Sequence, residues 1–242
     1  MTAYQIAIET IGKTGSLAIL KDETVVSAQQ LPSDRRTAAT LAVHLDELLT
    51  ECRHSEISLR WVSVAAGPGS FTGLRIGVTA AKMLAYALSL PVLPVGSLAA
   101  LANAVGEFSP TSDPLGETLA VAMNAYRGQV YAATFTTEEL SSQNAGQWED
   151  RAEVLGMEQW ERRLQDIAAN GPLKLIGDVK VVPTDQSQWF QKRSEVDAVG
   201  VGRLACKLML QSDHSERLFQ SPFEVVPRYL RPSAAEEKAS SS

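Results

Sequence analysis

The chain has 242 residues, of which 45% are hydrophobic and 21% charged, a composition typical of a globular protein that can bury a full core. Its formal net charge of −6 argues against a protein that holds nucleic acid by itself through clustered Lys and Arg. Cys52 and Cys206 lie far apart without CxxC spacing, which indicates reduced core residues. Pro91 and Pro94 interrupt the longest apolar stretch, so we expect no membrane span and a cytoplasmic location.

Three predicted strands open the chain, and alternating helices and strands follow. Each strand is a short apolar run bounded by turn residues. The first helix is capped by Ser33, and Ala38, Leu41, Leu45 and Leu48 recur in it at spacings of three and four. The predicted order is βββαβαβα, with strands at residues 4–8, 16–20, 24–31, 61–66 and 91–95 and helices at about residues 34–52, 74–88 and 97–106.

The second half of the chain is predicted to repeat the first in weaker form. After a polar stretch at residues 107–116, an apolar strand, a turn and another strand recur in the same order. The predicted elements are strands at residues 119–123, 129–135 and 173–176 and helices at residues 157–169 and 196–211. We therefore predict an α/β fold with two lobes, residues 1–106 and 107–232, each a mixed sheet flanked by helices, and a disordered tail at residues 233–242.

The most informative motif is GPGSFTGLRIG at residues 67–77, which joins the buried strand at residues 61–66 to the next helix. Glycines permit backbone angles closed to other residues, proline fixes its own φ, and a hydroxyl side chain can cap the free N–H groups of a helix. The motif predicts a sharp strand-to-helix elbow, formed by Gly67, Pro68, Gly69, Ser70, Thr72 and Gly73. Two interpretations stay open, an anion site at the helix N-terminus or tight packing of the helix on its sheet.

Neither of two phosphate-binding motifs is met. The sequence GKT at residues 12–14 could end a P-loop, but Ala7, inside a strand, stands where the opening glycine should be. Gly67, Gly69 and Gly73 fail the dinucleotide pattern GxGxxG because the last spacing is one residue too long. The motifs therefore predict no nucleotide cofactor.

Catalytic and metal-binding patterns are not met either. The three histidines show neither HxxxH nor HExxH spacing, and Ser70 lacks the GxSxG context of a nucleophile. Glu9 and Asn124 end equivalent strands at the predicted cleft, but an amide cannot act as a general base. We therefore predict no catalytic residue and no metal.

The helix that follows the elbow carries both small and large apolar residues. Small residues let another backbone approach closely, and large apolar residues provide contact area. One face can therefore cover the sheet and the other a partner; the alternative is that both faces are buried within the same lobe. The small residues are Gly73, Gly77, Thr79, Ala80, Ala81 and Ala87, and the larger ones are Leu74, Ile76, Met83 and Leu84.

Four segments of the chain resemble the TsaB family, also called YeaZ. They are AAGPGSFTGLRIGVTAAKMLAYALSLPVLPVGSLAAL at residues 65–101, IAIET near the start, NAYRGQVYAATF from Asn124 and PRYLRPSAAE from Pro227. This family is glycoprotease-like and provides a noncatalytic subunit of the bacterial machinery that makes threonylcarbamoyladenosine in tRNA. The resemblance implies a duplicated actin-like or heat-shock-ATPase-like (ribonuclease H-like) fold that has lost the elements for nucleotide and metal chemistry.

The resemblance also implies partners. The helix around residues 35–52 and the helix after Gly73 would form one exposed face that pairs with the related catalytic subunit TsaD, or with a second copy to give a homodimer in isolation. TsaD would carry the metal and modify the adenosine beside the anticodon, the small ATPase TsaE would join, and tRNA would be bound only through the complex. The candidate partner-binding residues are Arg35, Thr37, Leu41, Leu45, Leu48, Arg75, Ile76, Thr79, Ala80 and Met83.

The sequence departs from the family pattern at the predicted cleft. Glu9 stands where family members often have Asp, Asn124 replaces another Asp, and Tyr126 precedes Arg127 where Arg usually comes first. Two other functions stay open: an active ATPase or glycoprotease-like metallohydrolase that uses the cleft between the lobes, and a homodimeric module with an unrelated partner. The enzyme would need a phosphate site and a metal site that the motifs do not provide.

Overall fold

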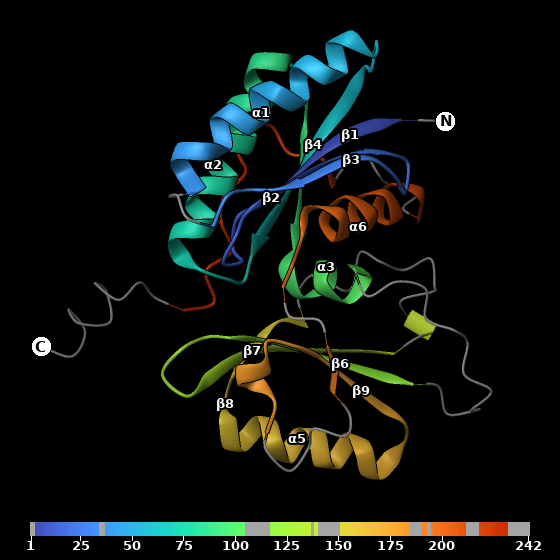
Figure 1. Ribbon diagram of the computed structural model, residues 1–242. Helices are drawn as coiled ribbons and strands as arrows, with labels where there is room; N and C mark the ends of the chain where they lie inside the picture. The colour runs from blue at the N-terminus through green and yellow to red at the C-terminus, as the bar shows by residue number, and fades with distance from the viewer. Residues whose placement is uncertain are drawn as a thin grey trace, which may run out of the picture.

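The computed structural model describes residues 3–33, 37–104, 117–136, 138–139, 151–183, 190–192, 195–211 and 218–231. These residues form two five-stranded mixed sheets, each with helices packed against it (Figure 1). The predicted two-lobed α/β class is therefore confirmed. No helix in the described part of the chain is long and apolar enough to cross a membrane.

The first sheet has the strand order β3-β2-β1-β4-β5. Its central strand β1 pairs antiparallel with β2 and parallel with β4, so that Ile6 lies opposite Ile19 on one side and Val62 on the other. Helices cover both faces of this sheet, which explains why β1 and β4 are buried along most of their length. The elements of this lobe are β1 (Tyr4–Glu9), β2 (Ser16–Lys21), β3 (Thr24–Gln30), α1 (Thr37–His54), β4 (Leu59–Gly67), α2 (Phe71–Leu88), β5 (Val92–Gly96) and α3 (Ser97–Ala104).

The second sheet repeats this topology with the order β10-β9-β6-β7-β8. Its strand β6 takes the place of β1, because β7 pairs with it antiparallel and β9 parallel. Where the first lobe has α2, the described residues of the second lobe hold only the short 3-10 helix η3 (Val179–Val181). The remaining elements are β6 (Thr118–Asn124), β7 (Gln129–Thr136), β8 (Glu153–Gly156), α5 (Met157–Asn170), β9 (Leu173–Gly177), β10 (Phe190–Lys192) and α6 (Ala198–Gln211).

The helices form layers on the two sheets. In Figure 1, α1 and α2 cover the outer face of the first sheet, α5 covers the outer face of the second sheet, and α3 lies between the sheets. One apolar core joins both sheets through α3 and α6 and includes Leu98, Phe135 and Leu204. A second core lies under α1 and α2, and a third lies around Trp160 of α5. The lobes are therefore packed together through a shared core.

The end of the chain returns to the first sheet. Helix α6 contacts β1, β2 and β4. Residues 218–231, which we name the strap, continue along the first lobe: Gln220 exchanges two backbone hydrogen bonds with Val92 of β5, and the Arg228 N–H donates to the Ala66 carbonyl. Both segments thus pack on the first sheet although the predicted lobe boundary assigned residues 107–232 to the second lobe. The division at residue 106 stays a prediction.

The predicted elements differ from the observed ones in a few places. Strands β8 and β10 were not predicted, because four and three residues are too few to show an alternating pattern. Helix α2 begins at Phe71, three residues before its predicted start, because Ser70 caps it. Cys52 and Cys206 are buried and free.

Candidate protein interface

The elbow between β4 and α2 is built from a glycine, a proline and a capping serine. Gly67 has a φ of +127°, an angle that other residues adopt only under strain. Ser70 is the N-cap of α2, and its hydroxyl accepts a hydrogen bond of 3.3 Å from the Gly73 N–H. The Leu74 N–H donates to the Ser70 carbonyl at 2.8 Å. The chain can therefore leave the strand and start the helix within three residues.

The glycines of the elbow and of α2 lie against the loop that follows β1. A Cβ at Gly69 would overlap the side chain of Ile11, a Cβ at Gly73 would overlap the Thr10 carbonyl, and one at Gly77 would overlap the Thr10 hydroxyl. That hydroxyl also donates to the Gly73 carbonyl at 2.7 Å. These contacts favour the close-packing interpretation of the elbow over the anion site.

The two faces of α2 have different surroundings. Its inward residues, including Val78, Ala81 and Ala85, are buried in the core between α1, α2 and the first sheet. On the other side Thr79 is exposed, and Met83 leaves 68% of its surface exposed. Helix α2 is therefore buried on its inward face only. The face that carries Thr79 and Met83 is open to a partner.

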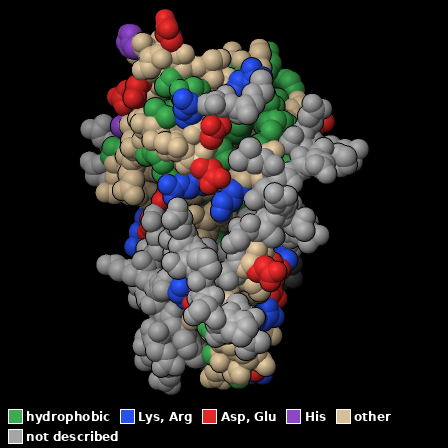
Figure 2. Space-filling view, turned by 90° about the vertical axis from the view of Figure 1, so that its right-hand side faces the viewer, with side chains coloured by type: hydrophobic (Ala, Val, Ile, Leu, Met, Phe, Trp, Pro, Cys, Tyr) green, Lys and Arg blue, Asp and Glu red, His purple; other side chains and the backbone are tan. Residues whose placement is uncertain are grey.

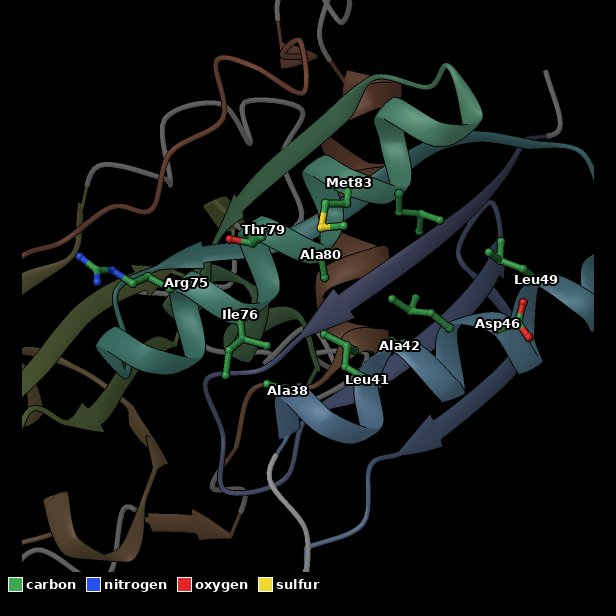
Figure 3. Close-up of a pocket in the computed structure, with 12 residues that line it drawn as sticks. Ala38, Leu41, Ala42, Asp46, Leu49, Arg75, Ile76, Thr79, Ala80 and Met83 are labelled. Atoms are coloured by element: carbon green, nitrogen blue, oxygen red, sulfur yellow. The ribbon is translucent and has the colours of Figure 1, made fainter.

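Helices α1 and α2 lie side by side and leave a mainly apolar groove between them, with a volume of about 590 Å³ (Figure 3). Apolar side chains of one helix can enter a groove of this kind on another protein. The groove is lined by Ala38, Leu41, Ala42, Leu45, Asp46 and Leu49 of α1 and by Arg75, Ile76, Thr79, Ala80, Met83 and Leu84 of α2.

Seven of the ten predicted partner-binding residues line this groove: Leu41, Leu45, Arg75, Ile76, Thr79, Ala80 and Met83. Leu48 is buried in the core under α1, Thr37 is half-buried at the helix start outside the groove, and Arg35 lies outside the described residues. The prediction did not include Ala38, Ala42 or Leu49. These three residues are four and seven positions apart, which places them on one side of α1. The same helical spacing, read from the sequence, would have identified them as part of the groove.

A charged side chain lies toward each end of the groove (Figure 3). The Arg75 guanidinium stacks 4.0 Å from the centre of the Phe71 ring, and its Nε donates to the Tyr229 hydroxyl at 3.1 Å. Asp46 lies near the opposite end with Leu49. The centre between these charges is apolar, which is the composition expected of an interface with a polar rim.

Glu9 ends β1 and is fully buried at the start of the loop that packs on the elbow. Its carboxylate accepts hydrogen bonds from the N–H groups of Ile11 and Gly12 and from the Ser16 hydroxyl. Ser16 in turn accepts a hydrogen bond of 2.9 Å from the Ala198 N–H at the start of α6. Glu9 therefore holds the turn between β1 and β2 and, through Ser16, the start of α6.

Burial raises the pKa of Glu9 from 4.5 to about 7, against the lowering effect of the Gly12 and Ile11 N–H groups and the Ser16 hydroxyl. The folded protein then keeps this proton at pH values where the unfolded chain has lost it, so stability should fall as pH rises from about 4.5 to about 7.

We expect the free energy of unfolding of wild type to fall between about pH 5 and about pH 8 by roughly 2 to 3 kcal/mol more than that of Glu9→Gln, which cannot titrate at this position. Urea unfolding of both proteins at both pH values measures this difference. A difference between the two proteins that does not change with pH would contradict the role given to Glu9.

Asn124 ends β6, the counterpart of β1, and has a similar role. Its side-chain oxygen accepts a hydrogen bond of 2.8 Å from the Tyr126 N–H, two residues later, as Glu9 does from Ile11. Both residues thus cap the turn after their strand. Within the described ranges, no three His, Cys, Asp or Glu side chains come together as a possible metal site.

The surface of one side of the molecule carries mixed charges. Figure 2 shows the side that faces right in Figure 1, where Lys and Arg side chains intermingle with Asp and Glu around the middle of the molecule. The described residues on this side therefore present no broad basic patch of the kind that holds RNA.

Comparison with known proteins places the chain in a family. Residues 31–209 match the family described as tRNA N6-adenosine threonylcarbamoyltransferase (TsaD). The chain is 37% identical over 132 residues to the tRNA threonylcarbamoyladenosine biosynthesis protein TsaB of Bacillus subtilis, a match that covers 54% of each chain. It is 29% identical over 165 residues to the protein of the same name in Escherichia coli K12, covering 67% of each chain. These matches span about half to two thirds of the length of the relatives.

A solved structure described as YeaZ from Pseudomonas aeruginosa has the same fold. It superposes with a TM-score of 0.63 at 22% sequence identity, covering 94% of this chain and 100% of that chain. The family match spans well over half of the chain. The chain therefore belongs to the TsaD family, and its similarity to several TsaB proteins confirms the resemblance that its sequence predicted.

Proposed function

We propose that this protein is a noncatalytic subunit in the biosynthesis of threonylcarbamoyladenosine in tRNA, and that it binds a catalytic TsaD protein through the groove between α1 and α2. The observation that carries this proposal is the open apolar groove, which is lined by seven residues predicted to bind the partner. The similarity to proteins named for this biosynthesis supports the pathway.

The surroundings of the cleft residues support a noncatalytic role. The Glu9 carboxylate accepts two hydrogen bonds from the turn after β1 and one from Ser16 of β2, and Asn124 likewise caps its own turn. Ser70 caps α2. Each of these polar groups has a structural task, so none of them is free to act as a base or nucleophile without breaking local structure.

The second lobe gives a reason why the partner should bind the first lobe. In the described residues of the second lobe, α5 stands alone on the outer face of its sheet, whereas α1 and α2 form a pair. A pair of helices leaves a groove between them that can receive side chains from a facing helix. TsaE as a further partner, a homodimer in isolation and a cytoplasmic location stay proposals from the family resemblance.

The test is a reconstitution with the purified full-length protein and the TsaD protein of the same organism. We expect the two to form a stable complex, and we expect tRNA modification by a mixture with TsaE to require this protein. Titration calorimetry with ATP and Mg²⁺ on the protein alone tests the alternative enzyme. Turnover by the isolated protein that Glu9→Gln or Asn124→Ala abolishes would support an active ATPase and contradict the proposal.

A further inference from the structure

Exposed apolar side chains gather on α2 and the strap. Seven of the ten large apolar side chains that the described residues leave exposed lie on these two segments. Phe223 is 76% exposed and Val226 is 65% exposed, and both belong to the strap. Apolar surface concentrated on one side of a protein usually marks a binding site.

The strap is held firmly on the first lobe although it has no regular secondary structure. Val225 is fully buried in the core under α1 and α2, and its carbonyl accepts a hydrogen bond of 3.0 Å from Lys82 of α2. The ring of Tyr229 stacks on Phe71, with 4.6 Å between the centroids. Val226 lies between these two anchors, and Phe223 lies between Val225 and Gln220, which is bonded to Val92 of β5. Both exposed residues are therefore held in place on the first lobe, which lowers the entropy cost of binding a partner.

The strap extends the surface that begins at the groove. Thr79, Met83 and Tyr86 follow one another at helical spacing along the exposed ridge of α2. Thr79 and Met83 line the groove on one side of this ridge, and Tyr86 contacts Phe223 of the strap on the other, with 5.6 Å between the ring centroids. The apolar surface thus runs from α1 across α2 to the strap.

The groove alone is small for a stable interface. Twelve residues line it, whereas an interface of standard size uses roughly 20 to 30 residues on each side. A partner that covers only the groove would leave Tyr86 and Phe223 in water beside it. The strap supplies additional surface of the composition that interfaces favour, because it includes the exposed aromatic side chains of Phe223 and Tyr229.

We infer that the strap is a second part of the docking surface, and that the TsaD partner covers the groove and the strap together. This inference rests on the proposed function, because it names further surface for the same partner. Phe223 and Val226 are its principal contacts.

The test compares the affinity of the full-length protein for TsaD, measured by biolayer interferometry, between wild type and two strap variants. The first variant is Phe223→Ser combined with Val226→Ser, and the second is Val226→Ser alone, which breaks no ring contact. We expect the Kd to rise roughly tenfold to a hundredfold in the double variant and by a smaller factor in the single one. The control is Val26→Ser, an exposed valine on β3 at the opposite edge of the first sheet, which should leave the Kd unchanged.

The outcomes separate this inference from the proposed function. Loss of binding in Ala80→Arg, together with a Kd within twofold of wild type in both folded strap variants, would overturn the inference and leave the proposed function standing. Undiminished binding in Ala80→Arg would instead contradict the proposed function. If sedimentation velocity shows that the strap variants weaken self-association while binding to TsaD is unchanged, the strap binds a second copy of this protein and not TsaD, and the inference is wrong.

Discussion

Replacing Ala80 by arginine should abolish binding to TsaD while the protein stays folded. Ala80 is half-buried on α2 and lines the groove opposite α1. In the free protein a long arginine side chain can lie along the groove with its charged end in water. In the complex the same side chain would fill space meant for the partner and bury an unpaired charge. We therefore expect the Kd to rise at least roughly a hundredfold, or about 3 kcal/mol.

Co-purification and titration of the Ala80→Arg variant with TsaD measure this effect, and circular dichroism checks the fold. Ala169→Arg is the matched control, since Ala169 is an exposed helical residue on α5 of the second lobe. It introduces the same side chain and charge far from the groove, and it should bind like wild type. Equal affinity of the folded Ala80→Arg variant and wild type would show that the groove is not the interface.

Gly67→Ala should cause a large loss of stability. Gly67 has a φ of +127°, and a Cβ there would overlap the carbonyl oxygen of Arg228 in the strap. The substitution therefore combines backbone strain with a clash against backbone that is itself bonded to Ala66. We expect the free energy of unfolding to fall by roughly 3 kcal/mol, and the thermal midpoint by roughly 6 to 12 °C.

The variant Gly128→Ala separates the cost of backbone strain from the cost of the clash with the strap. Gly128 also has a positive φ, +72°, but no atom outside its neighbours lies within 4 Å of the position that a Cβ would take. This control should lose only about 1 kcal/mol, the cost of the backbone angle. Urea unfolding of both variants gives the comparison, and hydrogen exchange should show faster exchange of the strap amides in Gly67→Ala alone. Equal losses in the two variants would mean that the strap contact adds nothing.

The sequence was sufficient for most of the fold because the regular elements carry strong local patterns. Strand β1 and helix α2 were found from apolar runs, helical spacing and the glycine elbow. The duplication was found from one repeated strand pair, and the sheets confirm it over five strands each. Short strands such as β8 were not predicted. Once the duplication is known, however, a counterpart of β3 is expected at the position of β8.

The site could be predicted only in part, because sequence pattern identifies an apolar stripe but not what covers it. Leu41, Leu45 and Leu48 belong to one stripe on α1, yet Leu41 and Leu45 reach the groove and Leu48 packs only in the core. The strap has no helical or strand pattern at all. Its position depends on contacts with residues more than a hundred positions earlier in the chain, such as the bond between Lys82 and Val225.

Hydroxyl-radical footprinting of the complex with TsaD tests the proposed interface most directly, because the chain carries two natural probes of equal exposure. Met83 in the groove and Tyr126 on the turn after β6 are each 68% exposed. We predict that binding of TsaD removes most of the labelling at Met83 and leaves the labelling at Tyr126 at its level in the free protein. Protection of Tyr126 with unchanged labelling of Met83 would contradict the interface and point instead to the side of the molecule where the turn lies.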